Sequence, residues 1–386
     1  MIKRDIPKIR FYSYQGAWTE KRIADMVKIS AGGDVDKIKL KESGKYPVIA
    51  NALTNKGIVG FYDDYKVKAP AVTVTGRGDV GYAVARHENF TPVVRLLTLQ
   101  SENIDVDYLE NQINSMRILN ESTGVPQLTA PQLGNYKVYY PEIDEQSAIG
   151  SLFRTLDELL ASYKDNLANY QSLKATMLTK MFPKAGQTVP EIRLDGFEGD
   201  WEEKYIGELA DIVRGASPRP IQDPKWFDPN SEIGWLRISD VTSQNGRIHS
   251  LEQKISKLGQ EKTRVLIEPH LLLSIAATVG KPVVNYVKTG VHDGFLIFMN
   301  PKFDREFMFQ WLEMYREKWN RYGQPGSQVN LNSDIVKNQK ILVPCMEEQQ
   351  AIGSYFSNLD NLINSHQEKI SQLETLKKKL LQDMFI

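Results

Sequence analysis

The chain has 386 residues, 41% of them hydrophobic and 25% charged, and its 48 basic and 48 acidic side chains cancel. This length is too great for one ordinary core, so we expect two domains of globular composition. A single cysteine, Cys345, excludes an intramolecular disulfide framework, and no stretch approaches the roughly 18 apolar residues of a membrane span, so we expect a soluble cytoplasmic protein.

The charge is not spread evenly along the chain. Residues 1–140 carry 19 Lys and Arg against 15 Asp and Glu, whereas residues 187–343 carry 20 against 21. Bulk charge therefore neither supports nor excludes a nucleic-acid partner, because the feature that matters is a local basic patch.

The first globular segment, residues 1–142, is predicted to be a small mixed α/β domain. Short strands alternate with turn signals, as at residues 51–57, and a helix is expected near residues 108–119. The β-rich run 71–74 leads into a glycine-rich stretch that ends at Gly81. A short strand over residues 136–140 closes the segment.

A long helix is predicted over residues 143–183. Its apolar positions alternate in steps of four and three, which is the spacing of a coiled-coil seam: Ile149, Phe153, Leu156, Leu160, Tyr163, Leu167 and Tyr170. Asp144 and Glu145 lie in the first turn, where the helix dipole favours negative charge. Pro183 and Gly186 end the helix.

The second globular segment, residues 184–343, repeats landmarks of the first. Residues 6–10 and 16–18 return 183 positions later as residues 189–193 and 199–201, and the strand-then-glycine element returns as residues 271–280. A helix near residues 307–321 and a strand over residues 340–343 follow. The polar residues between these landmarks differ, as expected for two copies of one domain with two different targets.

A second long helix is predicted over residues 344–386. It matches residues 141–182 at 17 of 42 aligned positions, 203 residues apart. Its seam repeats the same spacing: Ile352, Phe356, Leu359, Ile363, His366, Ile370 and Leu373. Gly150 and Gly353 occupy the same helical position and indicate a close backbone approach.

We therefore expect an α+β protein with a pseudo-two-fold internal repeat. Its two mixed α/β domains are separated by two long helices, which form an antiparallel coiled coil. The alternative is that each helix packs only on its own domain. Because residues 6–18 mirror residues 189–201, which follow the first helix, the chain ends should also lie close together.

The whole arrangement resembles the specificity subunit of type I restriction-modification systems. The resemblance rests on the duplicated order of domain and helix, and on the Pro-x-x-(Asp/Glu)-Glu-Gln-x-Ala-Ile motif that begins at Pro141 and Pro344. It also rests on residues 326–331, Gly-Ser-Gln-Val-Asn-Leu, and on the elements ending at Gly81 and Gly280. The first copy departs from the usual Gly-Ser-x-Gln at residues 124–127.

The resemblance implies that each globular segment is a target recognition domain for one half of a bipartite double-stranded DNA sequence. We call these segments the first and second readers. The family implies a helix pair that fixes the unread gap, two methyltransferase subunits and, in some systems, endonuclease/translocase subunits, in a prokaryotic cytoplasm. S-adenosylmethionine, Mg²⁺ and ATP would belong to those partners, so the chain itself would hold no cofactor and would not be an enzyme.

Candidate DNA-reading residues are those whose side chains suit phosphates or base edges. For any single one of them, an ordinary solvated surface role is at least as good an interpretation. In the first reader they are Lys45, Asn51, Asn55, Thr75, Arg77, Tyr82 and Arg86. In the second reader they are Arg214, Arg219, Arg237, Ser239, Asp240, Ser274, Thr278, Lys281 and Gln328.

Catalytic signals fail on inspection. The chain has no Pro-Pro, hence no adenine-methylase motif, and the Gly280–Lys281 pair lacks the rest of a phosphate loop. Residues 200–204 mimic a nuclease motif, but the repeat partner at 17–21 lacks its carboxylate. The histidines and the cysteine show no metal-ligand spacing.

Two other functions remain as hypotheses: a coiled-coil scaffold that does not read DNA, and an intrinsic nuclease or methyltransferase.

Overall fold

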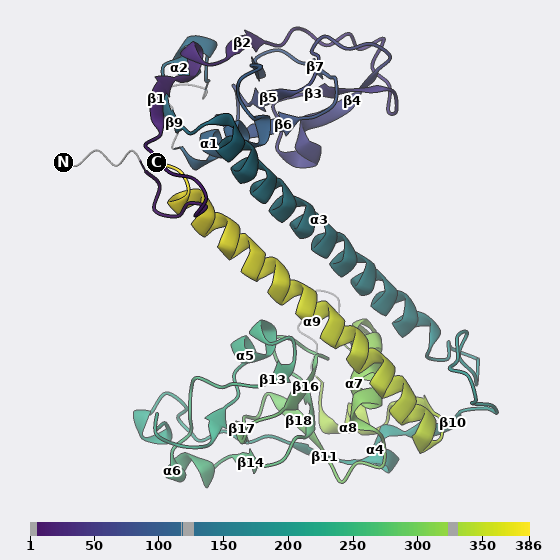
Figure 1. Ribbon diagram of the computed structural model, residues 1–386. Coiled ribbons are helices and arrows are strands. Elements are labelled where there is room, and N and C mark those ends of the chain that lie inside the picture. Colours follow the sequence, from purple (N-terminus) through teal and green to yellow (C-terminus); the bar gives the residue numbers. More distant parts are fainter. Residues whose placement is uncertain (1–5, 117, 119–126, 323–330) are drawn as a thin grey trace. The chain divides into compact units, whose positions relative to one another are not determined.

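The computed structural model describes residues 6–116, 118, 127–322 and 331–386. The chain divides into two compact units, one formed by Met1–Asn166 with His366–Ile386 and the other by Leu167–Ser365. Both boundaries fall inside the long helices α3 (Ile143–Lys180) and α9 (Met346–Asp383), which are labelled in Figure 1. Each unit therefore contains one reader and a section of each long helix. None of the helices described is long and apolar enough to cross a membrane.

The described part of the first reader contains three small sheets. Their strand orders are β2-β8-β5-β6, β4-β3-β7 and β1-β9. The strands are β1 (Thr19–Arg22), β2 (Lys28–Ala31), β3 (Tyr46–Ile49), β4 (Ile58–Tyr62), β5 (Ala71–Val74), β6 (Ala83–Arg86), β7 (Thr91–Pro92), β8 (Leu97–Gln100) and β9 (Lys137–Tyr140). Helix α1 (Val106–Ser115) packs its apolar face on β5 and β6, and α2 (Ala130–Gly134) contacts β2. The mixed α/β fold predicted for this segment is confirmed.

The second reader repeats this arrangement with additions. Its sheets have the orders β11-β18-β15-β16-β13, β12-β17-β14 and β10-β19. The strands are β10 (Glu202–Tyr205), β11 (Asp211–Arg214), β12 (Gly234–Trp235), β13 (Arg247–Ile248), β14 (Arg264–Leu266), β15 (Leu271–Ser274), β16 (Pro282–Asn285), β17 (Thr289–Val291), β18 (Phe295–Met299) and β19 (Lys340–Val343). The helices are α4 (Ile206–Leu209), α5 (Ile238–Ser243), α6 (Lys257–Gln260), α7 (Arg305–Tyr315) and α8 (Ser333–Lys337).

The large sheets of the two readers differ at one edge. Strands β11, β18, β15 and β16 follow the order of β2, β8, β5 and β6, and α7 packs on β16 as α1 packs on β6. Strand β13 is an addition that pairs parallel with β16, whereas β6 is the edge strand of the described first sheet. The second reader therefore has a strand at an edge where the described part of the first reader has none.

The long helices pair antiparallel within each unit. In the first unit, Asp157 of α3 binds Lys377 of α9 at 2.5 Å, and Lys164 binds Glu374 at 2.7 Å. Residue numbers thus fall along α9 as they rise along α3. In the second unit, Lys174 and Asp360 make the equivalent pair, also at 2.5 Å. The predicted antiparallel coiled coil is confirmed.

The predicted seam is visible in the burial of α3 and α9. Phe153 and Phe356 are fully buried, and the seam positions that follow are more covered than their flanks. His366 lies on the seam beside Tyr163, with ring centroids 5.3 Å apart. Early seam residues also pack on their own readers, since Phe153 joins a cluster with Trp18. Packing between helices and packing on the readers, which the sequence left as alternatives, therefore both occur.

Each long helix ends on the start of the other. Phe385, after α9, packs against Phe153 of α3, with ring centroids 5.7 Å apart. Phe182, after α3, packs against Phe356 of α9 at 6.3 Å. The backbone N–H of Ile9 donates to the Asp383 carbonyl at 2.9 Å, which confirms that the N-terminal segment lies beside the end of α9.

A buried Arg–Glu pair joins these segments in both units. The Arg10 guanidinium donates two hydrogen bonds of 2.7 Å to the Glu145 carboxylate and a third to the Gly16 carbonyl. Arg193 repeats all three bonds with Glu348 and the Gly199 carbonyl. The Glu145 and Glu348 side chains are 2% and 1% exposed. Glu145, expected only to complement the helix dipole, is therefore also half of a buried bidentate pair.

The close approach predicted at Gly150 and Gly353 is confirmed. The Asp105 carboxylate caps α1 by accepting from the Tyr108 N–H at 2.9 Å, and Gly150 of α3 packs directly on this cap. A Cβ at position 150 would lie 2.9 Å from the Tyr108 nitrogen and closer still to the Asp105 carboxylate. Glycine is therefore required by packing and not by backbone conformation.

We expect Gly150→Ala to lower the free energy of unfolding by about 1–3 kcal/mol, because overpacking outweighs the gain of about 1 kcal/mol in helix propensity. Chemical denaturation of the full chain measures the change. The matched control is Ser151→Ala, at the exposed neighbouring position of the same helix. A Gly150→Ala protein more stable than the parent would contradict the packing argument.

Candidate nucleic-acid interface

Two equivalent hairpin loops stand at the ends of the large sheets. Residues 75–81 lie between β5 and β6, and residues 274–280 begin at the last residue of β15 and lead to β16. In both loops the closing glycine N–H donates at 2.8 Å to the carbonyl of the first residue, Thr75 or Ser274. Gly81 and Gly280 have φ angles of +90° and +78°, a region that favours glycine. The strand-then-glycine elements are thus one loop type in two copies.

In the first loop, two candidate DNA-reading residues build the loop itself. The Thr75 hydroxyl donates to the Asp79 carbonyl and accepts from the Tyr82 N–H at 2.9 Å. The Asn51 side chain accepts from the Gly76 N–H at 2.8 Å and donates to the Val94 carbonyl at 3.1 Å. Both polar groups of Asn51 are therefore occupied within the reader.

The second loop is held in a similar way. Ser274 is fully buried, and its hydroxyl donates to the Ala276 carbonyl at 3.0 Å and accepts from the Thr278 hydroxyl at 3.0 Å. The Lys281 ammonium binds the Asn245 side chain at 2.8 Å and also the Glu313 carboxylate. These three candidates support the loop from within.

Other candidates of the first reader lie at its surface. Lys45, Asn55, Arg77 and Tyr82 are all exposed. Arg86 is half-buried and donates to the Thr73 hydroxyl and the Lys56 carbonyl. Burial lowers the pKa of Arg86 to about 10, so the side chain is still cationic at neutral pH.

In the second reader, the structure brings Arg214 and Arg219 together on Asp293. The Arg219 guanidinium binds the Asp293 carboxylate at 2.5 Å, and Arg214 donates to the Asp293 carbonyl at 2.6 Å. Both arginines remain exposed. Asp293 was not predicted, although it holds both cations at one surface.

The remaining candidates of the second reader lie near α5 or outside the described chain. Arg237 binds the buried Asp240 carboxylate at 2.9 Å, and the same carboxylate accepts from the Arg237 backbone N–H. Ser239 between them is exposed. Gln328, with most of residues 326–331, lies outside the described residues, as do residues 124–126 of the first copy.

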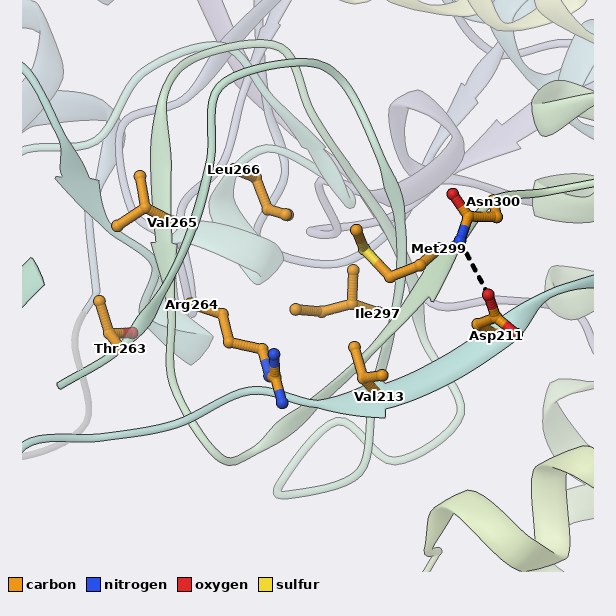
Figure 2. Close-up of a pocket in the computed structure, with 9 residues that line it drawn as sticks. All are labelled: Asp211, Val213, Thr263, Arg264, Val265, Leu266, Ile297, Met299 and Asn300. Atoms are coloured by element: carbon orange, nitrogen blue, oxygen red, sulfur yellow. Dashed lines mark hydrogen bonds between the residues drawn. The ribbon is translucent and has the colours of Figure 1, made fainter. Parts of the chain in front are cut away.

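A pocket of about 480 Å³ opens on the second reader between β11, β14 and β18. Figure 2 shows its lining, which is mainly aliphatic, with the Asn300 amide donating to the Asp211 carboxylate at 2.8 Å. Arg264 is its one cationic side chain, and none of the candidate DNA-reading residues lines it. Elsewhere in the described parts of both units, no group of three or more His, Cys, Asp or Glu side chains is placed to hold a metal ion.

A cluster of charges lies between α1 and the long helices in the first unit. Asp107 of α1 binds His87 at 2.8 Å and Arg154 of α3 at 3.3 Å. Glu110, one turn further along α1, has its pKa raised to about 7 by burial and by the Asp157 carboxylate, against the opposing effect of Lys377. The Asp107–Arg154 ion pair therefore joins this reader to α3, and the charge of Lys377 on α9 acts on Glu110.

Sequence reasoning missed most of these framework contacts. Glu145, Asp157 and Lys174 are each identical in the second copy of the long helix, as Glu348, Asp360 and Lys377. These polar residues are retained in both copies although most other polar residues differ. That retention was the sequence signal that could have identified them as framework residues. Their partners could not be identified from the sequence, since Arg10 and Glu145 lie 135 residues apart.

The family profile of the type I restriction modification DNA specificity domain matches residues 15–169 and 198–375, which include most of both readers. The chain belongs to this family. It is similar to the type I restriction enzyme MjaVIII specificity subunit of Methanocaldococcus jannaschii, at 21% identity over 94% of this chain and 91% of that protein. It is also similar to a putative type I specificity subunit of Mycoplasma pneumoniae, at 26% identity over 93% of this chain and 94% of that protein.

A solved structure of the type I restriction-modification S subunit from M. genitalium has the same fold. The TM-score is 0.69 at 15% identity, and the match covers 99% of both chains. The chain is thus a specificity subunit of the type I restriction-modification class with two recognition domains, which are the readers described above.

Stability should depend on pH through Glu110. Its pKa rises from 4.5 to about 7 on folding, so the folded state binds more protons between these values and stability falls as the pH rises through this window. The free energy of unfolding should therefore fall between pH 5 and pH 8, and Glu110→Gln should remove about 2 kcal/mol of this fall. Denaturant unfolding at both pH values measures it, with exposed Glu102→Gln as control. An unchanged pH dependence in Glu110→Gln would refute the assignment.

Proposed function

We propose that each reader recognises one half of a divided DNA sequence, while the paired helices keep the number of base pairs between the halves constant. The observation that carries this proposal is that two family domains share one frame but differ in the polar residues displayed on it. A shared frame suits a common role, and different polar surfaces suit different base sequences.

The exposed candidates have the chemistry that DNA contact requires. Arg77 and Lys45 of the first reader can bind phosphates or guanine, and the Asn55 amide suits adenine. In the second reader, the exposed arginines on Asp293 provide the same chemistry. A net charge of zero does not oppose this role, because the arginines on Asp293 form a local cationic surface.

The helix pair has features of a docking platform for two copies of one partner. Leu159 and Leu376 of the first unit are 43% and 44% exposed, and they lie at the same level because Asp157 and Lys377 bind each other beside them. Leu159 precedes the seam residue Leu160, and Leu376 precedes Lys377, which is the next position in the same spacing after Leu373. In an antiparallel pair these two positions lie on one flank. The equivalent residues of the second unit, Leu173 and Leu362, are 37% and 41% exposed.

We expect the partners on these flanks to be methyltransferase subunits that carry S-adenosylmethionine. An endonuclease/translocase that uses Mg²⁺ and ATP is a further expected partner in some systems. In this proposal the chain itself performs no chemistry and acts with its partners in a prokaryotic cytoplasm. Two equal surfaces suit two copies of one protein.

Replacing residues 20–140 with the corresponding segment of another specificity subunit should change one half of the methylated motif and leave the other half and the gap unchanged. Methylome sequencing of cells that carry the chain with its methyltransferase subunit gives the motif. Replacement of residues 204–343 is the reciprocal experiment. If either replacement left both half-sites unaltered, or if methylation did not depend on the chain, a scaffold that does not read DNA would be the better description.

Leu159→Glu with Leu376→Glu should reduce the number of bound methyltransferase subunits from two to one, because two charges would be buried at one flank. Native mass spectrometry of the assembled complex measures the stoichiometry. The matched control is Ala161→Glu with Thr375→Glu, at exposed positions on the same helices. If the protein with Leu159→Glu and Leu376→Glu still bound two methyltransferase subunits, this flank would be excluded as the docking surface.

A further inference from the structure

Arg247 on the added strand β13 is a half-buried cation with an unusual set of contacts. Its guanidinium lies 2.5 Å from the Glu306 carboxylate of α7, donates to the Tyr286 hydroxyl at 3.0 Å and stacks 3.8 Å from the centre of the Phe309 ring. The side chain is 17% exposed. The family match assigns no role to Arg247. Its position on a two-residue edge strand does not explain these contacts either.

The same guanidinium reaches the helix pair through Asp360 of α9. One oxygen of Asp360 accepts from Gln310 of α7 at 3.1 Å and lies 3.5 Å from Arg247, and the other lies 2.5 Å from Lys174 of α3. A single carboxylate therefore joins the second reader to both long helices. All these residues belong to one compact unit.

The first unit makes the corresponding connection differently. Asp107 occupies the position of Glu306 and binds Arg154, a cation supplied by α3 and not by the reader. Asp157 occupies the position of Asp360, and Lys377 binds it. The described first sheet ends at β6, so it has no strand at the place of β13. The cation that joins reader to helix thus comes from the reader only in the second unit.

This difference gives Arg247 control over orientation rather than folding. The second reader has one apolar core of its own and shares a larger one with α3 and α9. Its polar contacts with α9 lie at two levels of that helix. Glu348 and Gln349 in the first turn accept from Arg193 and from the Asp304 backbone N–H, and Asp360, further along, faces Arg247 and Gln310. Charged hydrogen bonds in a partly buried network are directional, so they select one angle among those that apolar packing alone would allow.

We propose that Arg247 is a positioning residue that fixes the angle of the second reader on the helix pair and thereby restricts the gap length that the complex accepts. This inference rests on the proposed reading of a divided DNA sequence. Successive base pairs are displaced by about 3.4 Å and rotated by roughly one tenth of a turn, so accepting a gap longer or shorter by one base pair requires the reader to tilt and shift. A reader held by a charged network resists this movement.

The test uses the complete chain with its methyltransferase subunit and measures methylation rates on DNA with the normal gap and with gaps one base pair longer and shorter. Arg247→Met should raise methylation at the altered gaps by about tenfold relative to the normal gap, with both half-site sequences retained. Arg247→Lys keeps the charge beside Glu306 but loses the second guanidinium nitrogen, which faces Asp360. It should therefore give an intermediate ratio of methylation at the altered gaps to methylation at the normal gap. Lys257→Met, at an exposed cation of the same reader, should leave the ratio unchanged.

A second variant shows whether the effect of Arg247→Met arises from a folding defect. Arg247→Met with Glu306→Gln removes both members of the ion pair, which avoids leaving a buried carboxylate unpaired, and it should show the same relaxed gap. An unchanged gap ratio in folded protein overturns the proposal. A changed half-site sequence also overturns it, because Arg247 would then influence base reading. If the unsubstituted complex methylates no split sequence, the proposed function itself fails, and this inference fails with it.

Discussion

The structure depends on one interaction that is made twice, the buried bidentate pair between an arginine beside the end of one long helix and a glutamate in the first turn of the other. Arg10 lies beside the end of α9 and binds Glu145 of α3, and Arg193 follows α3 and binds Glu348 of α9. Removing one partner of such a pair costs about 3–5 kcal/mol, because it leaves a buried charge uncompensated. The pair, with the aromatic residue that ends each helix, makes the two units equivalent although one of them is assembled from both ends of the chain.

This equivalence separates what the repeat keeps from what it varies. Both units contain the same helix caps and the same packing of Gly150 or Gly353 on such a cap. They also share an Asp–Lys pair between the long helices and the hairpin loop of the large sheet. The residues displayed beyond this frame differ, and among the strands that the structure describes, β13 with Arg247 occurs in the second reader alone. The proposed function accounts for this division, because a platform for two copies of one partner would have to be symmetric, whereas surfaces for two different DNA sequences would have to differ.

Much of the frame could be predicted because it depends on local spacing. The seam positions of α3 and α9, the close approach at Gly150 and the loops before Gly81 and Gly280 all follow from patterns within one helix or hairpin. The candidate reading residues could be predicted only as residue types. Asn51 and Ser274 have the chemistry for base contact, yet their polar groups are occupied inside the readers. Polar side chains at a tight turn serve the turn as readily as a ligand, and sequence does not distinguish the two uses.

The sequence by itself determined the duplication, the two long helices and the family, because heptad spacing and repeated motifs survive along the chain without reference to distant contacts. Only the tertiary structure decided which charges are partners. Arg10 and Glu145 are separated by 135 residues, and Arg247 and Asp360 by 113. Pairing at such separations is set by how sheets and helices pack, which places a cation within hydrogen-bonding distance of one carboxylate among many. The connections of each reader to the helices therefore became visible only in the folded chain.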